Sequence, residues 1–241
     1  MSDFVELWVY LSATPLFGLT ATLVVYVLAQ ALSTHLNQAA WANPVLWSVV
    51  VLASLLTLTG VDYPTYFSGA QFIHFLLGPA VVALAWPLWE RRQVLRQRWR
   101  ALLAAGVVGG VAASGSALAL GWAVGLPTDV LLSLAPKSVT APVAKGIADK
   151  IGGIPALAAV FAVLTGMVGA LSSTALLDRL KIATTPLGWM ARGFALGTAA
   201  HGIGAARALQ VNDDAGAYAG LALGLQVVLA SLLIPLLFWL F

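Results

Sequence analysis

The stretch that decides the fold is Leu134-Ala135-Pro136-Lys137-Ser138-Val139-Thr140-Ala141-Pro142, a polar run bounded by prolines inside an apolar part of the chain. Each proline lacks the backbone N–H that a helix needs, which disfavours an unbroken helix facing lipid. Interrupted backbone at membrane depth is tolerated where it packs on protein or lines a watery cavity. The run therefore predicts a discontinuous helix that faces the interior of a bundle.

The composition around this run is that of a membrane protein. Of the 241 residues, 61% are hydrophobic and 9% are charged, whereas soluble domains carry about 25% charged residues. A water-exposed surface cannot be built from this inventory. We therefore expect an all-α polytopic membrane protein with seven or eight membrane segments, each of about 20 residues. One transmembrane domain should cover residues 1–241.

Apolar stretches follow one another along the whole chain, separated by turn residues such as Asn43-Pro44 and Gly152-Gly153. They cover residues 7–29, 45–61, 71–89, 101–126, 130–149, 154–177, 190–210 and 216–241. The third stretch carries Pro79 and Pro87 in the way that the fifth carries Pro136 and Pro142. We predict that the third and the fifth stretches are both discontinuous helices.

Basic residues set the expected orientation. Five arginines between positions 91 and 100, flanked by apolar stretches, are typical of a cytoplasmic loop. Residues 91–100 should therefore lie in the cytoplasm and the N-terminus outside. The charge rule does not decide whether the fifth stretch crosses or re-enters, because both alternatives put the same number of basic residues inside. The re-entrant alternative is weakly preferred, since it makes the third and seventh stretches antiparallel, as in an inverted repeat.

Lys137 is the residue of the proline-bounded run most suited to bind a ligand. A lysine at membrane depth costs roughly 2.5–3.5 kcal/mol, so its ammonium should face a cavity or a partner. Ser138 and Thr140 add hydroxyls, and the breaks at Pro136 and Pro142 free backbone groups that attract anions. The alternative is a lysine that reaches the interface from the end of a segment.

A second polar run covers residues 192–207. Thr198 and His201 are three residues apart, which predicts a shared helix face. The neighbouring glycines permit close helix approach or a local break; they are Gly197, Gly202 and Gly204. His201 can change its charge between about pH 5 and 8, which suits a proton-coupled step. The alternative for His201 is a hydrogen bond to a neighbouring helix, and for Arg207 a position at the interface.

Other features of the sequence narrow the function. Pairs such as Gly193 and Gly197, four residues apart, predict close helix packing within the bundle. The sequence has no cysteine and three scattered histidines, and it lacks zinc-peptidase, phosphate-loop and nucleophile-elbow signatures. We expect no metal, no cofactor and no enzymatic activity. The arginine cluster is flanked by apolar stretches, so we expect no nucleic-acid partner. We expect the protein to be embedded in a lipid bilayer.

These motifs resemble the LrgB/CidB family. The run at 134–142, the sequence Ile151-Gly152-Gly153-Ile154-Pro155 and residues 192–207 occur in the family's order and spacing. The similarity extends upstream through residues 77–88, while the first 60 residues match in hydropathy and in Asn43-Pro44. The resemblance implies a fold like that of cation/proton antiporters and bile-acid symporters, an inverted repeat with crossed broken helices. It also implies a separate small LrgA/CidA-like membrane partner.

Two functional pictures follow from the resemblance. One is a holin/antiholin-like regulator of murein hydrolase export and autolysis; the other, from the plastid glycolate/glycerate translocator, is secondary transport of small monocarboxylates. We favour a transporter of the bacterial inner membrane that forms a homo-oligomer, because a holin-type lesion needs neither Lys137 nor His201 at depth. The expected substrate-binding residues are Lys137, Ser138, Thr140, Thr198 and His201. The expected supporting residues are Pro79, Pro136, Pro142, Gly197, Gly202, Gly204 and Arg207.

Overall fold

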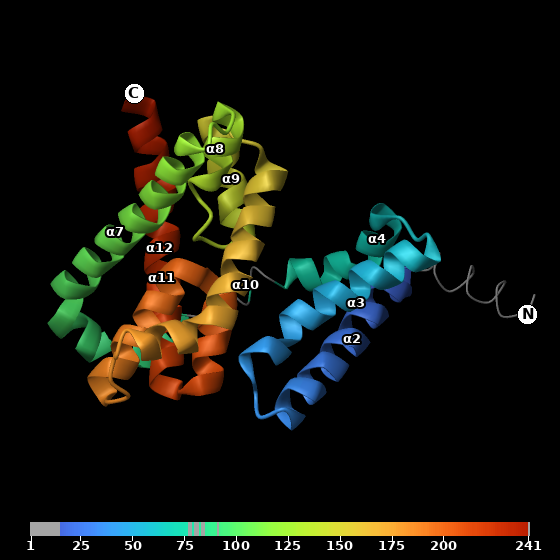
Figure 1. Cartoon of the computed structure of the whole chain (residues 1–241), viewed down its shortest axis with the longest axis horizontal. Helices are drawn as coiled ribbons and strands as arrows, with labels where there is room; N and C mark the ends of the chain where they lie inside the picture. Colours follow the sequence, from blue (N-terminus) through green and yellow to red (C-terminus); the bar gives the residue numbers. More distant parts are fainter. Residues whose placement is uncertain (1–14, 77–78, 80–81, 83–84, 91, 241) are drawn as a thin grey trace, which may run out of the picture. The chain divides into compact units, whose positions relative to one another are not determined.

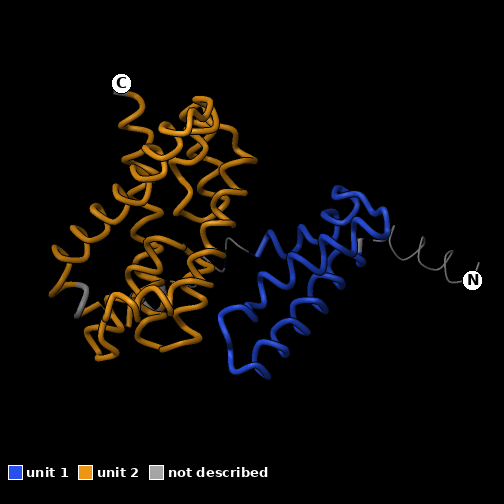
Figure 2. Tube along the Cα trace, viewed as in Figure 1, with its two compact units in different colours: residues 1–83 blue, residues 84–241 orange. Residues whose placement is uncertain are grey.

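The computed structural model describes residues 15–76, 79, 82, 85–90 and 92–240 of the chain. All regular secondary structure in these residues is helical. The chain divides into two compact units, residues 1–83 (unit 1) and residues 84–241 (unit 2), which Figure 2 distinguishes by colour. Each unit is described by itself below, and the single domain expected from the sequence stays a prediction.

Unit 1 is a small group of helices: α2 (Pro15–His35), the 3-10 turn η1 (Ala40–Ala42), α3 (Pro44–Thr59) and α4 (Tyr63–Phe75). Asn43 determines where α3 begins, because its side chain accepts hydrogen bonds from the backbone N–H groups of Val45 and Leu46. α2 packs against both α3 and α4. The hydroxyls of Thr22 and Tyr66 lie 2.7 Å apart across the contact between α2 and α4.

Unit 2 contains the two polar runs. Its helices are α6 (Ala85–Glu90), α7 (Arg92–Ala123), α8 (Thr128–Leu134), α9 (Ala141–Ile151), α10 (Pro155–Arg179), α11 (Pro186–Val211) and α12 (Asp213–Leu240), labelled in Figure 1. Among the described residues, α2, α7, α10 and α12 are the helices long and apolar enough to cross a membrane. The all-helical structure and these long apolar helices agree with the predicted membrane protein.

The fifth apolar stretch is interrupted, as predicted, and it turns back on itself. α8 ends at Leu134, the following residues 135–140 are not helical, and α9 begins at Ala141. Beyond α9, the backbone N–H of Ile154 donates a 2.7 Å hydrogen bond to the Ser133 hydroxyl. The end of this segment therefore lies against the end of α8, so the chain turns back through residues 135–140 and α9. We call residues 128–154 the first hairpin.

α11 also turns back on itself. The backbone leaves the helical conformation at His201, where φ is 41° and ψ is −135°. Before this break, Gly193 and Gly197 lie against the backbone of Ala215 and Ala219 respectively, so the first half of α11 runs parallel to the start of α12. Because α12 starts directly after α11 ends, the second half of α11 must run back to that start. Residues 186–211 are the second hairpin, with its tip at His201.

Two side chains support this arrangement of the second hairpin. Arg192 from the first arm and Arg207 from the second arm line the same small cavity at the base of the hairpin. Within unit 2 both interrupted segments thus return to the end from which they start. The inverted repeat with crossed broken helices that the resemblance implied stays a prediction.

The arginine cluster is helical, and the prediction that residues 91–100 form a loop was wrong for the described part of the cluster. Residues 92–100 are the first turns of α7, which continues to Ala123. Arginine favours the helix, and neither glycine nor proline occurs between positions 92 and 105 to end it. A helix of this length extends about 48 Å, beyond the roughly 30 Å hydrocarbon layer. Its arginines can therefore stand outside that layer.

The predicted interruption of the third stretch falls mainly outside the described residues. α4 ends at Phe75 and α6 begins at Ala85. Between these helices the structure describes residues 76, 79 and 82, and it leaves the side chain of Pro87 undescribed. The discontinuous third stretch and the supporting role of Pro79 therefore stay predictions.

The first hairpin makes the membrane orientation testable. If it re-enters, α7 and α10 are consecutive crossings, and the start of α7 lies on the same side as the end of α10. Cysteines introduced for Gln97 and Lys181 should then react with impermeant maleimide from the cytoplasmic side. A cysteine for Val124, which follows α7, should react from the other side. Labelling of positions 97 and 181 from opposite sides would contradict the re-entrant hairpin, and periplasmic labelling at 97 would contradict the orientation.

Candidate functional site

The tip of the first hairpin, residues 135–140, carries three of the predicted site residues. Lys137 is half-buried, and its Nζ atom lies 3.5 Å from the Oγ atom of buried Ser138. Thr140 occupies the N-cap position of α9, and within the described structure its side chain does not cap the helix. The side chain of Pro136 is fully buried. The tip thus places an ammonium and two hydroxyls at the start of α9.

A serine of α7 holds this tip in place. The Ser114 hydroxyl donates a 2.7 Å hydrogen bond to the carbonyl of Ala135. In a continuous helix this carbonyl would accept from the N–H of Val139, but that N–H donates to the Pro136 carbonyl instead. Ser114 therefore satisfies a buried backbone group that the interruption would otherwise leave unpaired.

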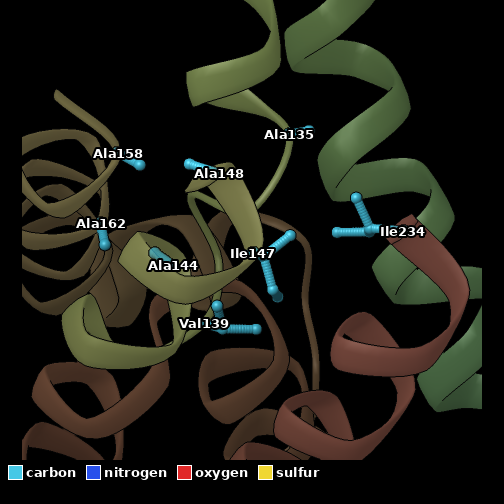
Figure 3. Close-up of a cluster of buried hydrophobic side chains, with 8 residues drawn as sticks. All are labelled: Ala135, Val139, Ala144, Ile147, Ala148, Ala158, Ala162 and Ile234. Atoms are coloured by element: carbon cyan, nitrogen blue, oxygen red, sulfur yellow. The ribbon is translucent and has the colours of Figure 1, made fainter. Parts of the chain in front are cut away.

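Small apolar side chains fix the first hairpin against α10. The cluster in Figure 3 combines residues from the tip, from α9, from α10 and from the end of α12. Its buried members are Ala135, Val139, Ala144, Ile147, Ala148, Ala158, Ala162 and Ile234. Because most of them are alanines, α9 can approach α10 closely. Ala162 is the member of this cluster that also contacts the second hairpin.

The imidazole of His201, at the tip of the second hairpin, is bound to α10. Its Nε2 atom lies 2.7 Å from the carbonyl oxygen of Ala162, and 4% of the residue is exposed. A carbonyl can only accept, so Nε2 carries the hydrogen and Nδ1 is the ring atom able to take up a proton. Gly166 makes room for the ring, since an added Cβ there would lie 2.8 Å from Cε1 of His201. The hydrogen bond to a neighbouring helix, one of the two alternatives from the sequence, is present.

Thr198 contacts a different helix from His201. A Cβ added at Gly109 of α7 would lie 2.8 Å from the Thr198 methyl group. The Thr198 hydroxyl is buried and has no hydrogen-bond partner among the described residues. The expected shared face is not observed, because the reversal at His201 turns the imidazole toward α10 while Thr198 faces α7.

Both hairpins pack against α10, and Ala162 takes part in both contacts. Its carbonyl binds His201, and its side chain belongs to the cluster that contains Val139 of the first tip. α9 and the second arm of α11 both begin at these tips, so each presents the partial positive charge of a helix N-terminus. An added Cβ at Gly202 would meet no other described atom within 4 Å, which leaves open space beside the second tip.

Among the predicted supporting residues, Gly197 and Gly204 pack against neighbouring backbone, whereas Arg207 lies at the base of the second hairpin. Gly197 and Gly204 are tightly packed, with an added Cβ at 2.1 Å from the Ala219 carbonyl oxygen and at 2.8 Å from that of Leu196. This confirms the close packing expected from glycines at four-residue spacing. Arg207 is buried away from the tips, at the hairpin base, where its Nη1 atom lies 3.5 Å from Gln210 Oε1.

Two further polar residues matter that sequence reasoning missed. Arg192 at the hairpin base forms an ion pair of 2.7 Å with Asp178 and donates to the Ile182 carbonyl, which joins the second hairpin to the end of α10. Gln226 of α12 is buried and donates a 2.6 Å hydrogen bond to the Gly106 carbonyl of α7. Gln226 is the single amide side chain in the apolar stretch 216–241, and this isolation could have marked it as a polar residue inside the bundle.

The fold and the tips define an all-helical membrane protein in which two interrupted segments meet at one central helix. The chain belongs to the LrgB-like family, which matches residues 22–240. It is 35% identical to the uncharacterized protein YxaC of Bacillus subtilis (strain 168), covering 82% of this chain and 84% of that relative. It is 31% identical to an uncharacterized protein of Haemophilus influenzae (strain ATCC 51907 / DSM 11121 / KW20 / Rd), over 81% and 83% of the two chains. No solved structure matches. The family predicted from the motifs is confirmed.

Proposed function

We propose that this protein is a secondary transporter of small monocarboxylates of the glycolate, glycerate, lactate and pyruvate class. The observation that carries the proposal is the packing of two interrupted segments against the same helix, α10, with Lys137 at one tip and His201 at the other. A carboxylate that leaves water needs a positive partner and several hydrogen-bond donors. The Lys137 ammonium, the Ser138 hydroxyl and the first N–H groups of α9 offer both.

The second hairpin supplies the remaining parts of the proposed site. The start of its second arm adds backbone N–H groups, and an added Cβ at Gly202 beside them would meet no described atom within 4 Å. His201 can take up a proton at Nδ1 while Nε2 stays bound to Ala162. The resemblance-based alternative, a holin/antiholin-like regulator, needs neither an ammonium nor an imidazole at these tips.

Uptake into proteoliposomes tests this function directly. The purified chain is reconstituted alone or with a small LrgA/CidA-like membrane protein, and radiolabelled glycolate, lactate or pyruvate is offered with an inward proton gradient. We expect saturable uptake above that of protein-free vesicles for at least one of these acids. Absence of uptake for all three, both with and without the partner, would overturn the proposal.

His201→Gln should change the pH dependence of uptake more than its maximal rate. Glutamine retains a donor for the Ala162 carbonyl but cannot titrate, so the dependence between about pH 5 and 8 should flatten. The control is His201→Leu, which removes the hydrogen bond and should lower stability by about 1 kcal/mol. An unchanged pH profile in His201→Gln, measured as initial uptake rates across this range, would exclude a proton-carrying role.

A further inference from the structure

A groove runs along unit 2 between α7 and the first arm of the second hairpin. Its volume is about 590 Å³, and its lining is apolar apart from two residues, Arg98 and Thr198. Leu102 and Val108 of α7 form one wall, and Phe194 of α11 belongs to the other. The groove therefore combines one exposed guanidinium with a long hydrocarbon surface.

The charged residue of the groove lies where a membrane surface is expected. Arg98 belongs to the exposed first turns of α7, ahead of the apolar part of that helix. In the same turns the Arg100 guanidinium lies 5.4 Å from the ring centre of Trp99, and that of Arg92 lies 4.7 Å from the Trp89 ring. Tryptophan and arginine side by side are typical of the headgroup region. We therefore expect Arg98 at headgroup level, with the apolar part of the groove leading toward Thr198.

We propose that this groove binds one anionic phospholipid, with the lipid phosphate at Arg98 and an acyl chain along Leu102, Val108 and Phe194. Charge complementarity selects this occupant, because basic pockets between membrane helices on the cytoplasmic side bind anionic headgroups. A phosphate also accepts the paired N–H donors of a guanidinium. An acyl chain also covers the apolar lining, which free phosphate would leave uncovered.

The lipid would act on the second hairpin. Phe194 and Thr198 lie on the arm that ends at His201, so an acyl chain in the groove packs directly against the element that carries the imidazole. Binding to the folded state stabilises that state in proportion to lipid concentration. The bound lipid should therefore raise the thermal stability of unit 2.

Thermal unfolding of the purified full chain in detergent tests the proposal without any transport assay. We expect phosphatidylglycerol to raise the unfolding temperature by about 5 °C at saturation, and phosphatidylcholine or inorganic phosphate to leave it unchanged. Arg98→Gln should remove the shift. Arg96→Gln, an exposed arginine of the same cluster that does not line the groove, should retain it.

A second variant tests the apolar part of the groove independently of the Arg98 charge. Val108→Trp fills the apolar part while leaving Arg98 in place, and it should also remove the shift. The proposal is overturned if phosphatidylcholine stabilises equally, if Arg98→Gln keeps the full shift, or if Val108→Trp keeps it. It is also overturned if Val108→Trp converts an oligomer to a monomer in size-exclusion light scattering, because a second copy of the chain then fills the groove.

Discussion

Lys137→Met should abolish carboxylate uptake, with a rate at least about a hundredfold below that of the unaltered protein. The substitution keeps a side chain of similar length at the tip of the first hairpin but removes the charge that faces the substrate. Removing one partner of a buried charged pair costs about 3–5 kcal/mol, and each 1.36 kcal/mol corresponds to a factor of ten in rate. Initial rates of labelled glycolate uptake into proteoliposomes measure the effect.

Two controls make this loss specific. Lys150→Met removes an exposed lysine from the far end of α9 and should leave uptake unchanged. Lys137→Arg keeps a positive charge with different geometry and should retain part of the activity. Yield from membranes and unfolding temperature should be the same in all three variants. Normal uptake by Lys137→Met would remove the proposed site and favour the holin-like role, which requires no buried cation.

Gly197→Ala should lower the free energy of unfolding of the protein, in contrast to Gly220→Ala. The new Cβ would lie 2.1 Å from the Ala219 carbonyl oxygen, which is backbone and cannot rotate away. The first arm of the second hairpin must then move away from α12. Overpacking of this kind costs about 1–3 kcal/mol, and we expect the unfolding temperature to fall by about 3–10 °C.

Gly220→Ala is the matched control for this substitution. Gly220 lies in α12, one residue beyond Ala219, and an added Cβ there would meet no described atom within 4 Å. Because alanine is the better helix former by about 1 kcal/mol, Gly220→Ala should leave stability unchanged or raise it slightly. Equal unfolding temperatures for the two variants would show that the contact between Gly197 and Ala219 does not hold the hairpin.

The first interruption could be predicted from the sequence because its cause is chemical and local. Pro136 and Pro142 each remove a helix donor, and Lys137 between them marks the break as an interior one. The packing role of Gly197 was predictable for a similar reason. Gly193 and Gly197 are four residues apart in an apolar segment, and this spacing is typical of close helix packing. The hydroxyl of Ser114, which completes the tip, follows only from tertiary structure.

The second hairpin could not be predicted in the same way. The reversal occurs at His201 with a positive φ, a conformation uncommon for residues other than glycine. Three glycines around it indicated a break, but not its position or the return of the chain. Local spacing also predicted a common face for Thr198 and His201, and the reversal between them separates their contacts. The helical arginine cluster was missed because charge indicates the side of a membrane and not the backbone conformation.

The two hairpins have a consequence for how the chain is made. α8 and α9 extend only about 10 Å and about 16 Å, and the exposed face of α9 carries Lys145, Asp149 and Lys150. Neither helix can leave the translocon as an independent membrane segment. Each hairpin can therefore be buried only after its neighbours are inserted. The first hairpin requires α10 and Ile234 near the end of α12. The second hairpin requires the start of α12. A nascent chain halted before α12 lacks these contacts of both hairpins, so it should be a substrate for membrane proteases.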